Sequence, residues 1–323
     1  MKEEKEMVNH PQHYNGDSQY ECIKVLKAWM SEDEYRGFLR GNAIKYICRL
    51  GKKDEAVQEL KKAAWYIDKL IESFARDARK TATAQVVHDE RFEYRMVEIP
   101  GTNYMMGVTP VTQEIYEQVI GENPSWFRDS NKCISNKALA KSTSNYPVEN
   151  VSWYDAVYFC NKLSMMGGFT PAYSVDGETD PEYWGYTPHK SKSIKAKVEC
   201  DFGASGYRLP TREEWKYAAK GGMDYTYSGS DNLDEVGWYH ENSKNITHPV
   251  AQKKPNDYGL YDMSGNVNEW VWGPISGTSA CRSYCGGSYF DFYEFCTVSS
   301  RVSDRANNRT CFTGFRLLRL LKG

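Results

Sequence analysis

The pattern of the chain changes near residue 96, and this break limits what the chain can fold into. Before it, apolar residues recur every three or four positions, as they do in helices. After it, glycine, tyrosine and tryptophan are concentrated and the helical spacing fades. A chain of 323 residues is long enough for two cores. We therefore expect a small all-helical domain over 1–80, a linker over 81–95 and a larger domain over 96–323.

Composition argues against several classes of protein. Lysine and arginine total 41 against 43 aspartates and glutamates, so the net charge of -2 gives no overall attraction to nucleic acid or anionic lipid. The first residues are charged, and no apolar run reaches the roughly eighteen residues of a membrane span. Nine cysteines without a dense framework favour free thiols in a reducing compartment. We expect a cytoplasmic protein with no membrane partner.

The longest helix is expected between Asp54 and Lys80. Its apolar residues follow the three-and-four spacing of an a/d heptad, with charged residues between them. This stripe either packs inside the small domain, which is the commoner use of such a face, or joins copies of the chain into a homo-oligomer. Two further helices are expected at about 20–30 and 35–50. The stripe consists of Val57, Leu60, Ala64, Ile67, Ile71 and Phe74.

Short motifs in the first 75 residues resemble a small phage domain known as SaV-like. The chain reads HPQHY at 10–14, ECI at 21–23, GNAIKY at 41–46 and LKKA at 60–63. The wider family includes a phage nucleotide kinase, so the resemblance makes Lys45 and Arg49 candidate phosphate contacts and implies a phage or prophage origin. No Walker loop is present, and the simpler interpretation is that these two residues form one solvated helix face. Nucleotide or nucleic-acid binding is therefore unproven.

A series of motifs after residue 96 occurs in a characteristic order. The chain reads MVEIPG at 96–101, VT at 111–112, YPV at 146–148, VSW at 151–153, YRLPT at 207–211, GLYDM at 259–263, GNV at 265–267, GGSY at 286–289 and GFR at 314–316. This order resembles the formylglycine-generating enzyme and sulfatase-modifying factor family. The resemblance implies an α+β, C-type-lectin-like fold with little regular structure for its length and many buried aromatic residues.

Local signals place several elements of this larger domain. Strands are expected at 96–99 and 104–107, and helices around 112–120, with Thr109 or Thr112 as cap, and over 152–163. Arg208 is predicted to be a structural hub at a strand end. A helix over 212–220 should begin at Thr211 or Pro210 beside it and stop at the following glycines.

Asn266 and Glu269 are candidate metal ligands. They offer hard oxygen atoms of the kind that calcium accepts, and the family resemblance implies a structural calcium there. The alternative is that Asn266 supports a turn through its side-chain amide while Glu269 pairs with an arginine. The sequence leaves both interpretations open.

The cysteine chemistry of that family is incomplete in this chain. Members that oxidise cysteine to formylglycine bind copper(I) through two cysteines after the Gly-Gly-Ser segment, and soft thiolates suit that metal. Cys296 matches the second cysteine, but Asp291 stands at the position of the first. We therefore expect no copper and no catalytic residues. The alternative is an enzyme, either a different cysteine oxidase or a nucleotide-handling N-terminal domain.

The stretch 281–316 contains no lysine, methionine or tryptophan. Many of its positions hold only residue types that codons ending in a pyrimidine encode, with Glu294 as an exception. This resembles the variable region of diversity-generating retroelements, in which adenines of a template are randomised. The resemblance implies a variable ligand-binding surface on a fixed scaffold. The candidate binding positions are Tyr284, Tyr289, Phe290, Asp291, Phe292, Tyr293, Phe295, Val302, Asp304, Ala306, Asn307, Thr310, Cys311 and Phe312.

The predicted function is non-catalytic, receptor-like recognition of a ligand that we expect to be a protein. The alternative for the phenylalanines is that Phe290, Phe292 and Phe295 belong to the core, since alternation at 290 and 292 suits a strand. If the surface binds, its main side chains should gather on one exposed face. That prediction covers Tyr289, Phe290, Phe292, Tyr293, Asp304, Asn307 and Phe312.

Overall fold

The computed structural model describes residues 26–27, 29–52, 55–81, 86–89, 94–128, 142–275 and 278–321. The chain divides into two compact units, Met1–Thr83 and Ala84–Gly323. Most of the helix expected at 20–30 lies outside the described residues. No helix in the described ranges is long and apolar enough to cross a bilayer.

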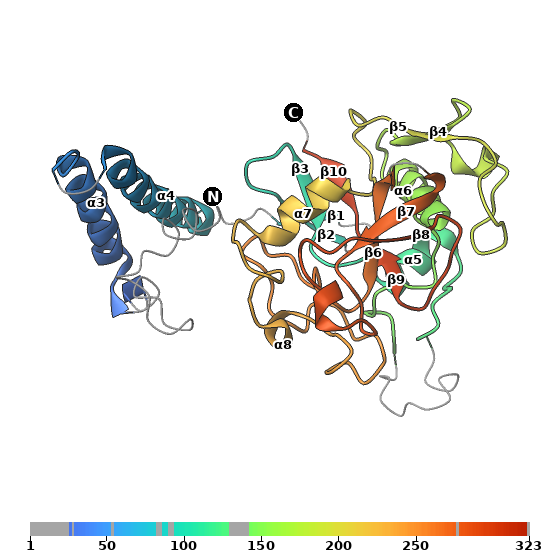
Figure 1. The fold of residues 1–323 in the computed structure, drawn as a ribbon. Coiled ribbons are helices and arrows are strands. Elements are labelled where there is room, and N and C mark those ends of the chain that lie inside the picture. The colour runs from blue at the N-terminus through green and yellow to red at the C-terminus, as the bar shows by residue number, and fades with distance from the viewer. Residues whose placement is uncertain are drawn as a thin grey trace. The chain divides into compact units, whose positions relative to one another are not determined.

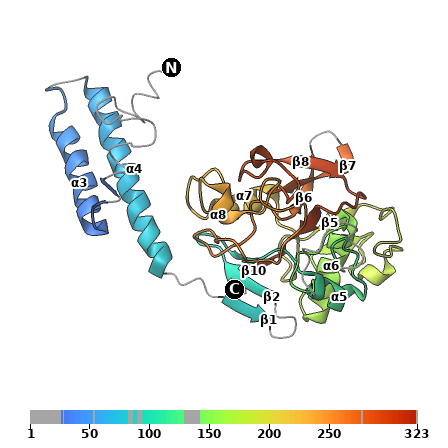
Figure 2. The same ribbon diagram turned by 90° about the horizontal axis from the view of Figure 1, so that it is seen from below.

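The small unit contains two antiparallel helices, α3 (Glu32–Cys48) and α4 (Ala56–Thr81), which lie side by side (Figure 1, Figure 2). The side chain of Ser31 accepts a hydrogen bond from the backbone of Glu34, and the carboxylate of Glu34 accepts one in return, so α3 starts with a capping box. Both helices agree with the predicted segments. Helix α3 ends at Cys48, three residues before Gly51, the residue expected to end it.

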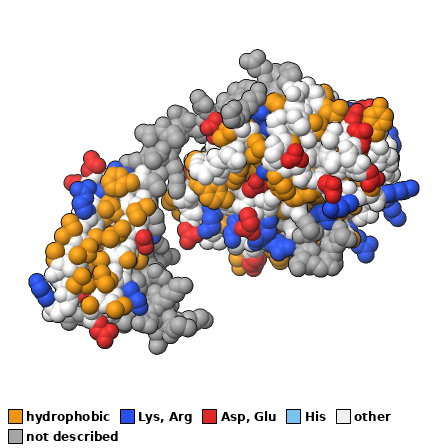
Figure 3. Space-filling model, turned by 90° about the horizontal axis from the view of Figure 1, so that it is seen from above, with side chains coloured by type: hydrophobic (Ala, Val, Ile, Leu, Met, Phe, Trp, Pro, Cys, Tyr) orange, Lys and Arg blue, Asp and Glu red, His pale blue; other side chains and the backbone are white. Residues whose placement is uncertain are grey.

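In the described part of the small unit, the apolar stripe of α4 lies outside the core. The helix turns Ala63 and Tyr66 toward α3 instead, where the ring of Tyr66 stacks on Tyr46 with centroids 5.6 Å apart. In the stripe, Val57 is 62% and Ile67 39% exposed. Figure 3 shows hydrophobic side chains gathered on one side of this unit. Among the described residues, the stripe therefore does not pack within the small domain, contrary to the expectation. The heptad spacing identified an apolar face without identifying what covers it.

The described part of the large unit contains two four-stranded sheets and a two-stranded one. The first sheet has the order β1-β2-β3-β10, and the second has the order β8-β7-β6-β9. Strand β10 pairs with β3, so the two ends of this unit meet in one sheet. The strands are β1 (Val86–Asp89), β2 (Tyr94–Glu98), β3 (Tyr104–Gly107), β4 (Tyr173–Val175), β5 (Val198–Cys200), β6 (Asn268–Ile275), β7 (Thr278–Cys285), β8 (Val302–Arg305), β9 (Thr313–Phe315) and β10 (Leu318–Leu320).

Strand β1 lies in the segment predicted to be a linker. It pairs antiparallel with β2, with Val87 opposite Met96. Tyr94, from the same segment, is buried, and its hydroxyl donates to the carbonyl oxygen of Thr109 at 3.0 Å. The large unit thus begins at residue 84 rather than 96, which corrects the predicted boundary. A strand of four residues is too short to show a clear alternation in the sequence.

The longer helices of the large unit begin where their capping residues predict. Thr112 caps α5 (Gln113–Ile120), which decides between the two threonines considered, and Ser152 caps α6 (Trp153–Met166). Thr211 starts α7 (Arg212–Lys220) with a capping box, and Gly221 ends it at a φ of 57°. The short helical segments are α8 (Leu233–Val236), η2 (Pro181–Tyr183) and η3 (Tyr293–Phe295).

Arg208 joins the first sheet to α7, as predicted for a structural hub. Its guanidinium forms two hydrogen bonds with the carboxylate of Glu214, at 2.7 and 2.8 Å. Its backbone exchanges hydrogen bonds with that of Leu318 in β10. The arginine therefore fixes the start of α7 against the edge of the sheet.

Buried aromatic residues fill the core of the large unit, as the family resemblance implies. Trp153 and Trp270 are almost fully buried, and their indole nitrogens donate to backbone carbonyl oxygens at 3.2 and 3.0 Å. The rings of Tyr116 and Phe159 stack with centroids 5.2 Å apart. These two indoles therefore fill the core with their polar atoms hydrogen-bonded.

Candidate binding site

The candidate site begins at a glycine turn after β7. Gly286 and Gly287 have φ angles of 94° and 70°, which favour glycine. A Cβ atom on Gly287 would lie 2.6 Å from the Sγ of Cys296, and one on Gly286 would lie 3.1 Å from the ring of Trp215. The turn therefore needs both glycines, and it fixes the point at which the following loop leaves the sheet.

Asp291 anchors this loop. Its Oδ2 accepts hydrogen bonds from Ser288 Oγ at 2.7 Å and from Asn268 Nδ2 at 2.9 Å. Its backbone oxygen accepts from the backbone nitrogen of His240 at 3.0 Å. The carboxylate that we predicted as a binding position is thus engaged by the protein itself and shapes the loop.

Aromatic side chains project from the loop. The ring of Phe292 lies 4.5 Å from that of His240, and Phe290 is parallel to Phe312 at 6.5 Å, both between centroids. Large exposed aromatic groups are not core residues, so the alternative that the phenylalanines are buried is wrong. Between 48% and 55% of each of four residues is exposed, and they form what we call the aromatic face: Phe290, Phe292, Tyr293 and Phe295.

Three of the predicted binding positions are buried. Tyr289 is 3% exposed and packs edge-on against Phe127, with centroids 5.3 Å apart. Tyr284 packs against Trp270 in the same geometry, and Ala306 is 2% exposed. The prediction that Tyr289 belongs to an exposed face is therefore wrong. The codon pattern restricts the type of residue at a position but carries no information on its burial.

The other predicted positions are partly buried. On β8, Asp304 accepts a hydrogen bond from the side chain of Asn308 at 2.6 Å. The Sγ of Cys311 lies 3.3 Å from the hydroxyl of Tyr289, so the end of the 281–316 stretch packs against this buried tyrosine. Besides Asp291, the predicted binding positions of intermediate exposure are Val302, Asp304, Asn307, Thr310, Cys311 and Phe312.

The rim of the aromatic face carries negative charge. The pKa of the Tyr293 hydroxyl is raised, first by its hydrogen bond with Glu294, then by the charge of Glu294, and less by desolvation and by the charge of Glu241. Glu241 also accepts a hydrogen bond from the hydroxyl of Tyr239 at 3.2 Å. The aromatic rings therefore lie beside carboxylates that favour a cationic partner group.

Cys296 does not fit the copper chemistry of the cysteine-oxidising relatives. Its side chain is fully buried under Gly287, and burial raises the pKa of its thiol to about 12. The thiolate is the form that binds copper(I), and burial disfavours it. Asp291, at the position of the partner cysteine, already accepts two hydrogen bonds from the protein. The residues present therefore do not fit a two-thiolate site.

Asn266 and Glu269 likewise do not fit a calcium site. Glu269 accepts hydrogen bonds from the guanidinium of Arg316 at 2.8 and 2.9 Å and from the indole of Trp215 at 2.7 Å. Asn266 has a φ of 63°, and its side-chain amide exchanges hydrogen bonds with the backbone of His248. This is the arrangement of the alternative interpretation, a turn-supporting amide and a paired carboxylate. The oxygens that calcium would need already accept hydrogen bonds from the protein.

Lys45 and Arg49 lie near the C-terminal end of α3, where their charged groups approach the ring of Tyr46, at 4.7 and 5.8 Å from its centroid. Lys45 donates to the side chain of Asn42 at 2.7 Å, and Arg49 lies 3.8 Å from the buried carboxylate of Glu59. Both side chains thus have partners within the small unit, and phosphate binding by them stays a prediction.

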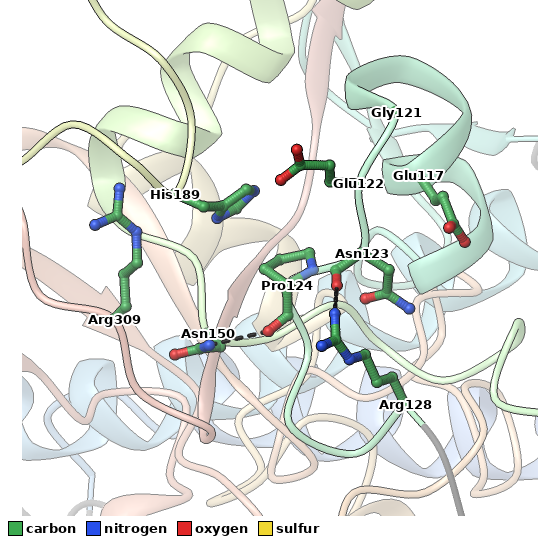
Figure 4. Close-up of a pocket in the computed structure, with 9 residues that line it drawn as sticks. All are labelled: Glu117, Gly121, Glu122, Asn123, Pro124, Arg128, Asn150, His189 and Arg309. Atoms are coloured by element: carbon green, nitrogen blue, oxygen red, sulfur yellow. Dashed lines mark hydrogen bonds between the residues drawn. The ribbon is translucent and has the colours of Figure 1, made fainter.

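A cavity of about 550 Å³ lies beside the end of the 281–316 stretch (Figure 4). On its wall, Arg309 donates two hydrogen bonds to the buried carboxylate of Asp155, at 2.7 and 3.1 Å. His189 lies 3.0 Å from the hydroxyl of Tyr116, and burial lowers the pKa of its imidazole. None of the nine lining residues is Ser, Thr or Cys, so the lining supplies no such nucleophile. Sequence reasoning missed this cavity because its residues come from separate segments.

Two residues that shape the aromatic face were also missed. His240 packs against Phe292 from a segment far away in the sequence, and no pattern marked it. Asn268 donates a hydrogen bond to the carboxylate of Asp291. Its position directly after the GNV motif at 265–267 was the only feature of the sequence that could have indicated this role. Contacts of this kind depend on the fold and are not visible in local spacing.

Comparisons with known proteins agree with the architecture. Residues 75–321 match the family described as sulfatase-modifying factor enzyme 1-like domain, and residues 8–68 match a family of unknown function, DUF3310. Chaperone protein LppX of Paenibacillus barcinonensis is 36% identical over 243 residues, which cover 68% of this chain and 80% of that protein. Formylglycine-generating enzyme of Streptomyces coelicolor is 33% identical over 147 residues, 35% of this chain and 46% of the enzyme.

A solved structure adds a likeness to a variable protein. Treponema denticola variable protein 1 superposes with a TM-score of 0.61 at 35% identity, covering 74% of this chain and 91% of that one. The fold and the resemblance to a variable protein are therefore as predicted. Together with the missing thiolate pair, this likeness supports a binding protein that is not a catalyst. The chain belongs to the family of sulfatase-modifying factor enzyme 1-like domains.

Proposed function

We propose that this protein recognises a partner protein through the aromatic face. One observation carries the proposal: four half-exposed aromatic side chains occupy the short segment 290–295 of a loop that other residues hold in place. Aromatic side chains give a large contact area and have few rotatable bonds to restrict on binding. Contiguous exposed apolar patches on soluble proteins commonly mark interaction sites.

The anchors of the loop are separate from the side chains that it presents. Gly287 and Cys296 meet beneath the loop, and Asp291 bonds to Ser288 and Asn268. The exposed rings can therefore change without loss of these contacts. A variable surface requires that the residues that hold the loop differ from the residues that contact the partner.

The charges around the aromatic face indicate the kind of partner. Glu294 hydrogen-bonds the hydroxyl of Tyr293, and the charge of Glu241 also acts on it, so a lysine or arginine of the partner would meet both an aromatic ring and negative charge. We expect the complex to form more slowly as salt concentration rises, since exposed charges are screened.

The proposal includes diversification of residues 281–316 by a retroelement in a phage or prophage. The absence of lysine, methionine and tryptophan from this stretch supports it. The test is the DNA around the gene. A near-copy of the codons for 281–316 beside a reverse-transcriptase gene, differing at template adenines, is the expected result. A gene without such a copy would contradict diversification and leave the aromatic face as a fixed binding site.

Binding is tested with two double variants of the full chain. Phe290→Ser with Phe292→Ser removes half of the aromatic face, and Tyr183→Ser with Phe202→Ser removes similarly exposed rings elsewhere. Proteins captured from a bacterial lysate by the wild type are purified, and their Kd values are measured by biolayer interferometry. The first variant should weaken binding about 100-fold, as loss of central aromatic contacts does, while the second binds like the wild type. Equal affinities for all three proteins would refute the proposal.

A further inference from the structure

The α4 stripe leaves a second apolar surface unexplained, on the small unit. All of its large members are exposed, from 39% at Ile67 to 62% at Val57. The guanidinium of Arg36 in α3 lies 4.5 Å from the centroid of the Phe74 ring, which identifies the side of α3 that borders the stripe. Ile47 is eleven residues, about three helical turns, after Arg36 and so lies on that same side. It is 45% exposed and widens the apolar surface.

The spacing of the stripe suits another helix with the same spacing. Its six positions alternate steps of three and four residues, so they occupy a and d of consecutive heptads. Two helices with this pattern bury their a and d side chains against each other, and an isologous pair uses one surface twice. The α4 stripe has this pattern, so the stripes of two copies are complementary to each other.

The charges beside the stripe favour one orientation of the two paired helices. Lys61 and Asp68 both occupy the e position of their heptads, and both are exposed. In an antiparallel pair, the e positions of the two helices face each other, so Lys61 of each copy meets Asp68 of the other. In a parallel pair, e faces g, where this helix has Ala56 and Ala63. Ala63 is also buried against α3.

We infer that α4 pairs antiparallel with α4 of a second copy of this chain. In this register Val57 meets Phe74, Leu60 meets Ile71, and the small Ala64 meets Ile67. The two α3–α4 hairpins then form a four-helix arrangement, with Ile47 at its edge. Each dimer carries two aromatic faces.

The oligomeric state of the full chain tests the inference by light scattering coupled to size-exclusion chromatography. The wild type should have twice the mass of one chain. Ile67→Glu, at the centre of the stripe, should give the mass of a single chain. The matched control, Tyr183→Glu, also places a carboxylate at an exposed apolar site and should remain dimeric. Far-ultraviolet circular dichroism checks that the helices of each variant are intact.

Charge exchange tests the orientation. Lys61→Asp and Asp68→Lys should each shift the equilibrium toward single chains, and the double variant should restore the dimer. A double variant no more dimeric than either single variant would refute the antiparallel register. A wild type that stays monomeric at its highest soluble concentration would refute the pairing itself, and would mean that residues 1–25 or the large unit cover the stripe. A monomeric Ile67→Glu that still binds the partner leaves the proposed function intact.

Discussion

Glu269 and Arg316 form an ion pair inside the large unit, where 1% and 0% of their side chains are exposed. Arg316 also donates to the carbonyl oxygens of Gly107 and Tyr261, both at 2.7 Å. Removing charges from water is costly, and the interior tolerates this pair because its donors and acceptors are satisfied. The pair therefore connects β6, β3, the loop at Tyr261 and the residue that directly follows β9 through one set of hydrogen bonds.

Loss of the carboxylate should leave a buried guanidinium without its partner. We predict that Glu269→Ala lowers the free energy of unfolding by about 3–5 kcal/mol, as measured by urea denaturation. Lys220→Ala, which breaks the exposed pair with Asp224, is the control and should cost less than about 1 kcal/mol. Equal losses in the two variants would show that the buried pair is not a major contributor.

Glu149 should make stability depend on pH. Burial raises the pKa of its carboxyl to about 8, from a usual value near 4.5. Between these two values the unfolded chain releases a proton that the folded chain keeps, so stability falls as pH rises from about 4.5 to 8, by up to about 1.4 kcal/mol per pH unit. Glu149→Gln keeps the oxygen that accepts from the backbone of Phe127 and removes the titration.

Urea unfolding of both proteins from pH 5 to pH 8 measures this effect. The difference in stability between Glu149→Gln and the wild type should grow in favour of the variant as pH rises. Other titrating groups, such as Asp262 with a pKa of about 6, affect both proteins equally. A difference that stays constant over this range would contradict a protonated Glu149.

At the scale of elements, the turn after β7 decides the course of the binding loop. Gly287→Ala should lower the free energy of unfolding by about 1–3 kcal/mol more than Gly177→Ala, because only the first adds a methyl group against Cys296. Both glycines have positive φ angles, 70° and 82°, so the backbone strain is common to the two variants. Thermal unfolding of the two proteins gives the comparison. Similar midpoints would mean that the loop adapts to the added carbon.

Elements with local signals could be predicted from the sequence, and those that depend on distant contacts could not. Thr211 and Gly221 mark the ends of α7 because caps are local chemistry. What covers the α4 stripe could not be predicted, because spacing alone does not identify the neighbour of a face. Tyr289 was placed on the surface although Phe127, far away in the sequence, covers it. The loop was found from its residue types, while its support by His240 required the fold.

At the scale of the whole molecule, the boundary between the units can be located by truncation. We predict that the fragment 84–323 folds by itself, because this unit has its own core. Its midpoint of thermal unfolding should equal that of the large unit in the full chain. Residues 96–323 should be less stable, since they lack β1 and the buried ring of Tyr94. Differential scanning calorimetry on both fragments gives the midpoints. An unfolded 84–323 fragment would show that the helices complete the core.

The pairing of β10 with β3 has a consequence for the order of folding. Leu318 pairs with Met106, so the first sheet closes only with residues that are synthesised after the whole stretch 281–316. Contacts between such distant parts of a chain form late and slowly. A version of the stretch that cannot make its turns delays this closure and leaves apolar strands exposed to chaperones and proteases. Under the proposed diversification, folding would therefore act as a quality check that removes unusable sequences before they meet a partner.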